Sequence, residues 1–480
     1  MSADSSTVIF IQKKIVPMFI KQLYTNCLAK AAYYIESNGE AAVVDPIRET
    51  EPYIQLAEER GAKIKYIFET HFHADFVSGH IDLAKKTGAK IIFGPGAQAK
   101  FEIYNAADGE VFPLGKISIQ AIHTPGHTPE STSYLVLDVN GNENSIFTGD
   151  ALFVGDVGRP DLLDGVIISK EEQSNTLYDT LNNKIKPLPD HVIVYPGHGP
   201  GSMCGKSIGK ETESTIGKEK LTNYALQPMS REEFMKVILA DQIPAPKYFV
   251  KNAIINRSGY ENIDDVMKRN GHALKVDEVK NEIANGALII DARKADDFEK
   301  GFIKNSINIG MDDSFAVWAG TLIDINQRII IVSDEDREKE AILRLARVGM
   351  ENVAGFLTGG IKSWEYAGEP IEKIESISAE EFAHQYKEGR GVVLDVRRVA
   401  EFNSGHLHEA NNIPLRDLEN RLSELNDEAE FLVHCAGGYR SMIAASILKK
   451  HGFSRIINVS GGFNKIKETG LHIETAMLVS

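Results

Sequence analysis

His71-Phe72-His73-Ala74-Asp75 follows the apolar, β-branched run Lys65-Tyr66-Ile67-Phe68, and the fold of the first part of the chain is decided by this stretch. Three further segments place a histidine or aspartate directly after an apolar run: Pro125-Gly126-His127, Thr148-Gly149-Asp150 and Pro196-Gly197-His198. Loops at strand ends can bring distant parts of a sequence to one point. Imidazole and carboxylate are ligands of borderline divalent metals, so the spacing predicts one metal site.

The same region alternates short β-branched runs with turn residues, which predicts a mixed α/β domain built around strands. The expected strands include residues 41–45, 65–68, 91–94 and 192–195, and the expected helices include 53–60 and 80–87. Residues 230–260 begin with a capping box, Ser230-Arg231-Glu232-Glu233, and contain prolines 244 and 246. We expect this segment to connect the first domain to the rest of the chain.

The histidine and aspartate motifs resemble those of the metallo-β-lactamase fold, and the resemblance implies an αββα sandwich over residues 1–258. Within it, the segments 125–131, 147–153 and 158–161 are similar to the persulfide dioxygenases. That resemblance implies one iron(II) per chain, held by His71, His127 and Asp150. His73, Asp75 and His198 would then orient the ligands and bond to metal-bound water.

Phe76 bears on the number of metal ions. A binuclear hydrolase of this fold has a histidine at this position, and a phenyl ring cannot coordinate a metal. Two histidines and one carboxylate on one iron leave positions for dioxygen and a sulfur atom. The alternative is a zinc-dependent thioester hydrolase of the glyoxalase II type with attached sulfur-carrier domains, and Phe76 counts against it.

Three further residues are candidates for substrate contact in this domain. Cys204 lies six residues after His198, and its possible roles are substrate or sulfur handling, or plain packing beside a glycine turn. Arg159 and Lys206 could bind substrate carboxylates, although surface or internal salt bridges are the more ordinary use of such residues.

The rest of the chain contains an internal repeat. Leu288-Ile289-Ile290-Asp291-Ala292-Arg293 matches Val393-Leu394-Asp395-Val396-Arg397, and the Gly359-Gly360 pair matches Gly461-Gly462. Each copy alternates strands and helices over about 100 residues, which predicts a small parallel sheet covered by helices. We expect the two copies to occupy residues 259–370 and 371–480.

Cys435-Ala436-Gly437-Gly438-Tyr439-Arg440 connects an apolar run to an amphipathic helix, so Cys435 is expected at a helix N-terminus. Backbone N–H groups and the helix dipole stabilise a thiolate there. Arg440 is expected to fix the loop or bind an anionic substrate. The pattern resembles the active loop of the rhodanese sulfurtransferases, which implies that Cys435 carries a sulfane sulfur.

In the first copy, Asp334 aligns with Cys435 in the segment Ser333-Asp334-Glu335-Asp336-Arg337. An aspartate cannot carry a sulfane sulfur, and three acids repel anions such as thiosulfate. We therefore expect an inactive copy, used for packing, for oligomerisation or for presenting the active copy.

Composition and charge restrict the partners. The chain has 480 residues, 42% hydrophobic and 25% charged, as ordinary globular proteins have. Its formal net charge of −15 is spread without a basic stripe, which argues against nucleic acid and anionic membranes. Three separated cysteines do not suit a disulfide framework. Lys13 and Lys14 interrupt a short apolar run near the start, so we expect a cytoplasmic protein with no membrane span.

The complete order resembles a persulfide dioxygenase and rhodanese fusion. The resemblance implies oxidation of a low-molecular-weight thiol persulfide by dioxygen to sulfite and thiol. It also implies that Cys435 makes or uses thiosulfate. The expected partners are therefore a small-molecule persulfide, dioxygen, and sulfite or thiosulfate, and we further expect a homo-oligomer.

Overall fold

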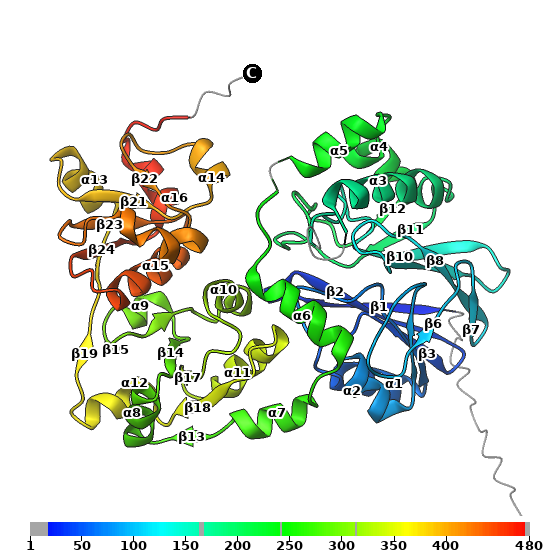
Figure 1. Ribbon diagram of the computed structural model, residues 1–480, viewed down its shortest axis with the longest axis horizontal. Coiled ribbons are helices and arrows are strands. Elements are labelled where there is room, and N and C mark those ends of the chain that lie inside the picture. The colour runs from blue at the N-terminus through cyan, green and yellow to red at the C-terminus, as the bar shows by residue number, and fades with distance from the viewer. Residues whose placement is uncertain (1–17, 163–167, 241, 313, 476–480) are drawn as a thin grey trace, which may run out of the picture. The chain divides into compact units, whose positions relative to one another are not determined.

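The computed structural model describes residues 18–162, 168–240, 242–312 and 314–475 (Figure 1). The chain divides into two compact units. The first runs to residue 245 and includes 249–260, and the second comprises 246–248 and the remainder from 261. Lys13 and Lys14 lie outside the described residues.

The first unit contains two six-stranded sheets. The first sheet has the order β1 (Phe19–Thr25), β2 (Lys30–Ser37), β3 (Glu40–Val44), β4 (Lys63–Phe68), β5 (Lys90–Phe93) and β6 (Tyr104–Asn105). The second has the order β12 (Ser214–Thr215), β11 (Ile193–Pro196), β10 (Glu143–Gly149), β9 (Thr132–Leu137), β8 (Ile117–His123) and β7 (Val111–Leu114). Strands predicted from the apolar runs are confirmed in both sheets.

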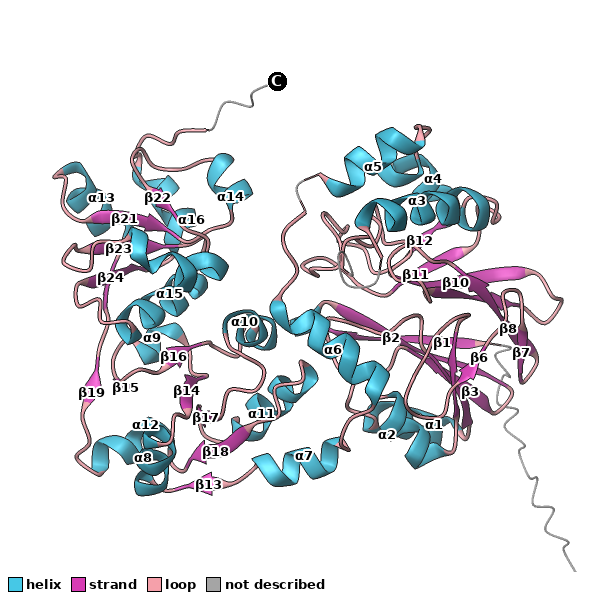
Figure 2. Cartoon of the chain, in the orientation of Figure 1, coloured by secondary structure: helices cyan, strands magenta, loops and turns pink. Residues whose placement is uncertain are grey.

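The two sheets face each other across an apolar core, to which Tyr33, Phe68 and Tyr134 contribute. Helices α1 (Glu51–Arg60) and α2 (His80–Thr87) cover the outer face of the first sheet, and α3 (Lys170–Thr180) and α5 (Arg231–Leu239) cover that of the second (Figure 2). The remaining helical segments are η1 (Asn26–Leu28), η2 (Leu181–Ile185), α4 (Ile216–Thr222), η3 (Tyr224–Leu226) and α6 (Lys247–Ser258). The predicted αββα sandwich is confirmed.

Most of the segment expected to lead out of the first domain belongs to that domain, and only residues 246–248 fall in the second unit. Ser230 and Glu233 form the predicted capping box at the start of α5. However, Phe234 and Ile238 are buried in the same core cluster as Leu177 of α3. The two apolar residues stand four apart and share one helix face, so α5 packs against the domain rather than crossing solvent.

The second unit contains two five-stranded sheets in which all neighbours are parallel. The first has the order β13 (Ala273–Leu274), β18 (Val353–Leu357), β17 (Ile329–Val332), β14 (Leu288–Asp291) and β16 (Ile307–Asn308). The second has the order β20 (Glu375–Ile377), β24 (Ile456–Val459), β23 (Phe431–His434), β21 (Val392–Asp395) and β22 (Asn411–Asn412). The same strand order in both confirms the predicted repeat.

A short antiparallel pair, β15 (Phe302–Ile303) and β19 (Ile371–Glu372), lies outside these sheets. The first copy has helices α7 (Ile263–Asn270), α8 (Val276–Ala284), α9 (Ala295–Phe298), α10 (Phe315–Leu322), α11 (Glu338–Arg347) and α12 (Gly360–Tyr366). The second has α13 (Ala379–Lys387), α14 (Val399–Asn403), η4 (Leu415–Glu424), α15 (Tyr439–Lys450), α16 (Gly462–Ile466) and η5 (Lys467–Thr469). Among the described residues, none of these helices is long and apolar enough to cross a membrane.

Candidate metal centre and cysteine loop

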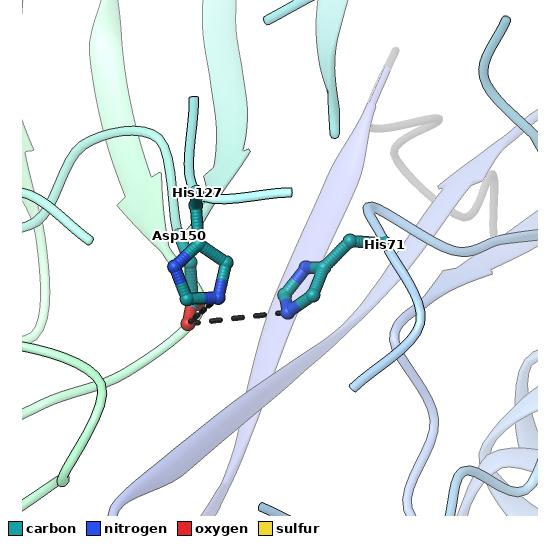
Figure 3. A group of neighbouring side chains, drawn as sticks. All are labelled: His71, His127 and Asp150. Carbon is teal, nitrogen blue, oxygen red and sulfur yellow. Dashed lines mark ion pairs between the residues drawn. The ribbon is translucent and has the colours of Figure 1, made fainter. Parts of the chain in front are cut away.

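His71, His127 and Asp150 come together at the strand ends of the first unit (Figure 3). They follow β4, β8 and β10, respectively, and all three are buried. The Nε2 atom of His127 lies 3.4 Å from Oδ2 of Asp150, and Nε2 of His71 lies 4.0 Å from the same oxygen. The three residues predicted as ligands therefore converge on one point.

Hydrogen bonds fix which nitrogen of each histidine is free. The Nδ1 of His127 is 2.9 Å from the carbonyl oxygen of Arg159, which can only accept, so this nitrogen carries the proton. The Nδ1 of His71 is 3.0 Å from Oγ1 of Thr70, whose own hydrogen is donated to Asp45. Both imidazoles therefore present an unprotonated Nε2 to the shared point.

The donor set fits a metal ion. Oδ2 of Asp150 and Nε2 of His127 are buried and have no hydrogen-bond partner among the described residues. Ligand atoms about 2.1 Å from one ion are roughly 3.0–3.4 Å apart, near the separations observed here. An ion at this point would satisfy the buried atoms that the protein leaves open.

The protonation states also suit a metal. Burial lowers the pKa of His71 well below its usual range, so the imidazole is neutral at pH 7. Burial alone would raise the pKa of Asp150, but His198 and His127 lower it well below its ordinary value. A neutral imidazole and an ionised carboxylate are the forms that bind metals.

His198 lies between two carboxylates. Its Nδ1 is 2.9 Å from Oδ1 of Asp150, and its Nε2 is 2.8 Å from Oδ2 of Asp75. Burial lowers its pKa, but Asp150 and Asp75 outweigh this and raise the pKa to about 9. His198, itself held by Asp75, thus binds Oδ1 of Asp150 and leaves Oδ2 directed towards His127 and His71.

His73 points elsewhere. Its Nε2 lies 3.2 Å from Oδ1 of Asp45 and 3.5 Å from Oε2 of Glu69, and the three residues form a separate buried cluster. Asp45 and Glu69 were not among the site residues predicted from the sequence. The available signal was position, because Asp45 and Glu69 directly follow β3 and β4 just as the ligands follow their strands.

The three predicted substrate contacts are placed differently from one another. Cys204 is buried, and its Sγ lies within 4.8 Å of ligand atoms of Asp75 and His198. Burial, with Asp75 and Asp150, raises the pKa of its thiol.

The Arg159 guanidinium forms two 2.7 Å hydrogen bonds to Asp161. Lys206 donates to the carbonyl of Val237 at 2.8 Å. Arg159 therefore forms the salt bridge that was its alternative use, whereas Lys206 donates to a main-chain carbonyl.

A largely apolar pocket lies beside the metal centre. Its lining includes Phe72 and Thr128, each adjacent in sequence to a ligand histidine, together with Leu162. Arg257 and Glu130 supply the charged groups of the lining. The pocket therefore adjoins the loops that carry His71 and His127.

Cys435 occupies the predicted position between β23 and α15. Its side chain is buried, and the backbone N–H of Gly438 donates to its Sγ at 3.1 Å. Gly438 has a φ of 105°, a conformation that favours glycine and that turns the loop into α15. Within the same unit, the Tyr439 hydroxyl donates to the carbonyl oxygen of Gly310 in the first copy at 2.9 Å.

Arg440 fixes the loop through Glu401, which was not among the predicted site residues. Its two terminal nitrogens each lie 2.7 Å from a carboxylate oxygen of Glu401 in α14. Burial alone would raise the pKa of Glu401, but Arg440 and then Arg398 lower it to about 2. Of the two roles predicted for Arg440, the geometry supports holding the loop.

The alignment of Asp334 with Cys435 is wrong by one residue. Val332 pairs with Asp291 just as His434 pairs with Asp395, so the next residues, Ser333 and Cys435, are equivalent. The glycine pairs agree, because Gly360 approaches the carbonyl of Ser333 as Gly462 approaches that of Cys435. The register of the paired strands, which the sequence does not show, determines the equivalence.

Comparisons with known proteins agree with this architecture. The family model of the metallo-beta-lactamase superfamily matches residues 25–198, and that of the rhodanese-like domain matches 275–367 and 378–469. The mitochondrial persulfide dioxygenase of Homo sapiens is 30% identical over 237 residues, which are 48% of this chain and 84% of that protein. A hydroxyacylglutathione hydrolase of Haemophilus influenzae is 28% identical over 217 residues, 41% of this chain and 91% of that protein.

A solved metallo-beta-lactamase structure from Staphylococcus aureus subsp. aureus COL covers 71% of this chain and 99% of its own, with 33% identity and a TM-score of 0.65. This match exceeds the length of the first unit alone, so it includes part of the second. The chain therefore belongs to the metallo-β-lactamase superfamily, with persulfide dioxygenases among its homologues, and carries two rhodanese-like domains after the metal-binding one.

Proposed function

We propose that the first domain is an iron(II)-dependent persulfide dioxygenase and that Cys435 transfers sulfane sulfur in the same chain. The observation that supports this most directly is the ligand set of two histidines and one aspartate. Such a set leaves coordination positions on an iron for a sulfur ligand and dioxygen. When bound, iron(II) would supply the redox chemistry that no side chain here supplies.

The residues of the chain would bind the substrate and orient the Asp150 carboxylate. The apolar pocket beside Phe72 and Thr128 would hold the carrier thiol. His198 and Asp75 keep the Asp150 carboxylate in place. The balanced reaction is RSSH + O₂ + H₂O → RSH + H₂SO₃, in which the terminal sulfur is oxidised and dioxygen is reduced.

The sulfur-transfer step uses Cys435. Its thiolate would attack the outer sulfur of a second persulfide, so that the S–S bond of the donor breaks and the donor thiol leaves. Sulfite would then take this sulfur from the enzyme persulfide, giving thiosulfate and regenerating the thiolate. Gly438 N–H is placed to stabilise the negative charge on Sγ before and after transfer.

The hydrolase relatives make a zinc-dependent thioester hydrolase the second candidate. Phe76 counts against it, because its buried phenyl ring supplies no ligand for a second ion. Metal analysis with oxygen-uptake measurement on glutathione persulfide separates the two. We expect about one iron per chain and oxygen consumption that Cys435→Ser leaves intact and His127→Ala abolishes. Stoichiometric zinc with thioester hydrolysis and no oxygen uptake would favour the hydrolase.

A further inference from the structure

Lys30, at the start of β2, is a fully buried lysine. Its Nζ lies 3.2 Å from Oδ2 of Asp45, and both side chains are almost completely inaccessible. The same Nζ lies 5.4 Å from the centre of the Phe76 ring. A buried ammonium is costly unless a fixed negative charge compensates it, so this placement demands an explanation.

The explanation lies in the cluster of Asp45, Glu69 and His73. One ligand atom from each of the three lies within 4.8 Å of the others, and all three residues are buried. Neither ring nitrogen of His73 has a hydrogen-bond partner within the described parts of the chain, and its Nε2 faces both carboxylates. Two carboxylates and an imidazole that face one another are the donors of a divalent-metal site.

We propose that Asp45, Glu69 and His73 form a second cation site of the domain and that the Lys30 ammonium takes the place of a metal ion in it. Nζ lies 3.2 Å from Oδ2 of Asp45, so a metal ion bound about 2.1 Å from that oxygen would lie no more than about 5.3 Å from Nζ. At that distance in a buried site, the two positive charges repel each other strongly. Lys30 therefore keeps a metal ion out of the cluster of Asp45, Glu69 and His73, separate from the ligand set of His71, His127 and Asp150.

Hydrogen bonds also connect this cluster to His71, one of the three ligand residues of the first metal site. Oδ2 of Asp45, which pairs with Lys30, accepts the hydroxyl hydrogen of Thr70 at 2.8 Å. Thr70 Oγ1 in turn lies 3.0 Å from Nδ1 of the ligand His71. Because the Lys30 ammonium is part of the protein, it holds Asp45, and through it the hydrogen bonds to Thr70 and His71, in place regardless of which metal ions are in solution. An exchangeable ion at Asp45 would not do so at every metal concentration.

Metal content tests the proposal without reference to enzyme activity. After loading with excess Mn²⁺ or Zn²⁺ and desalting, elemental analysis should give one ion per chain for the wild type and two for Lys30→Ala. The melting temperature of Lys30→Ala should fall by roughly 10 °C without divalent ions and recover when they are added. Lys65→Ala, which removes a half-exposed lysine 3.1 Å from Glu40, is the matched control and should bind one ion.

Two further variants show where the second ion binds and keep the test valid if Lys30→Ala does not fold. Adding Glu69→Gln to Lys30→Ala should return the content to one ion, and an extra ion that persists lies elsewhere and overturns the proposal. Lys30→Gln retains a donor to Asp45 and removes only the charge, so it should also bind two ions. A folded variant with one ion, or failure of both Lys30 variants to fold even with Mn²⁺ present, would contradict the proposal. Because no substrate is used, these outcomes are independent of the persulfide assignment.

Discussion

The two rhodanese-like copies share a frame and differ in a loop. In each copy an aspartate at the end of a strand binds the arginine two residues later, Asp291 with Arg293 and Asp395 with Arg397. The arginine then donates to the carbonyl of Gly301 or Gly405, at 2.8 Å in both. The buried frame has therefore been kept in both copies, whether or not the copy carries a thiol.

The two copies differ in the loop that follows their central strand, β17 in the first copy and β23 in the second. The second copy has Cys435 followed by glycines and Arg440, which pairs with Glu401. The first has Ser333 followed by three acids, and Arg337 there pairs with Asp312 and Glu340. Packing requirements explain the shared frame, whereas the sulfur transfer proposed for Cys435 would require only a few residues of one loop.

Cys435→Ser makes the second copy resemble the first, which has Ser333 at the equivalent position, and should have the largest effect. A hydroxyl is a far weaker nucleophile than a thiolate and cannot hold a sulfane sulfur. We expect cyanide-dependent cleavage of thiosulfate to fall by about 1000-fold or more. The thiosulfate assay measures this, with His127→Ala as the control that keeps activity; full activity in Cys435→Ser would remove Cys435 from the mechanism.

Glu401→Gln should have an intermediate effect, because it breaks the ion pair that holds Arg440. The loss should be about 10-fold in sulfur transfer and about 1–3 kcal/mol in unfolding free energy at pH 7. The folded-state pKa of Glu401, about 2, lies below its ordinary value of 4.5. Its contribution is therefore complete above about pH 4.5 and is lost as the pH falls towards 2.

Chemical unfolding from pH 7 to pH 3 checks this dependence. The difference in stability between wild type and Glu401→Gln should narrow below pH 4.5. Glu424→Gln is the control, since Glu424 pairs with Arg421 in an exposed position where solvent screens the charges, and it should cost much less stability than Glu401→Gln. A pH-independent difference would show that Glu401 acts through packing instead.

Ser333→Cys should have the smallest effect. It places a thiol at the position equivalent to Cys435, but the following acids repel anionic donors. In a Cys435→Ser background we expect no measurable recovery of thiosulfate cleavage, by the cyanide assay. Recovery would show that the missing thiol alone silences the first copy.

Much of this molecule could be predicted from sequence, because its strongest signals are local. Apolar runs ending in His71, His127 or Asp150 place each ligand at a strand end, and the parallel strands of the repeat fix Cys435 between a strand and a helix. The family motifs then supplied the fold. Such patterns can be recognised in the sequence without knowing which side chains are in contact in the folded protein.

Lys30 and Glu401 could not be found in this way. Lys30 stands in a strand 15 residues from Asp45, and Glu401 lies 39 residues before Arg440. Each looks like an ordinary surface charge until the tertiary fold buries it beside its partner. The one-residue misalignment at Asp334 has a similar origin, since strand pairing rather than residue type determines equivalence.

The contact between Tyr439 and Gly310 has a consequence for how the tail can be handled. A residue of the cysteine loop is anchored to backbone of the neighbouring copy, and Asn308 N–H donates to Ser446 of α15 nearby, at 3.1 Å. The second copy is therefore not self-contained. Produced alone, it would lose two of the hydrogen bonds that hold the Cys435 loop and the helix after it against the first copy.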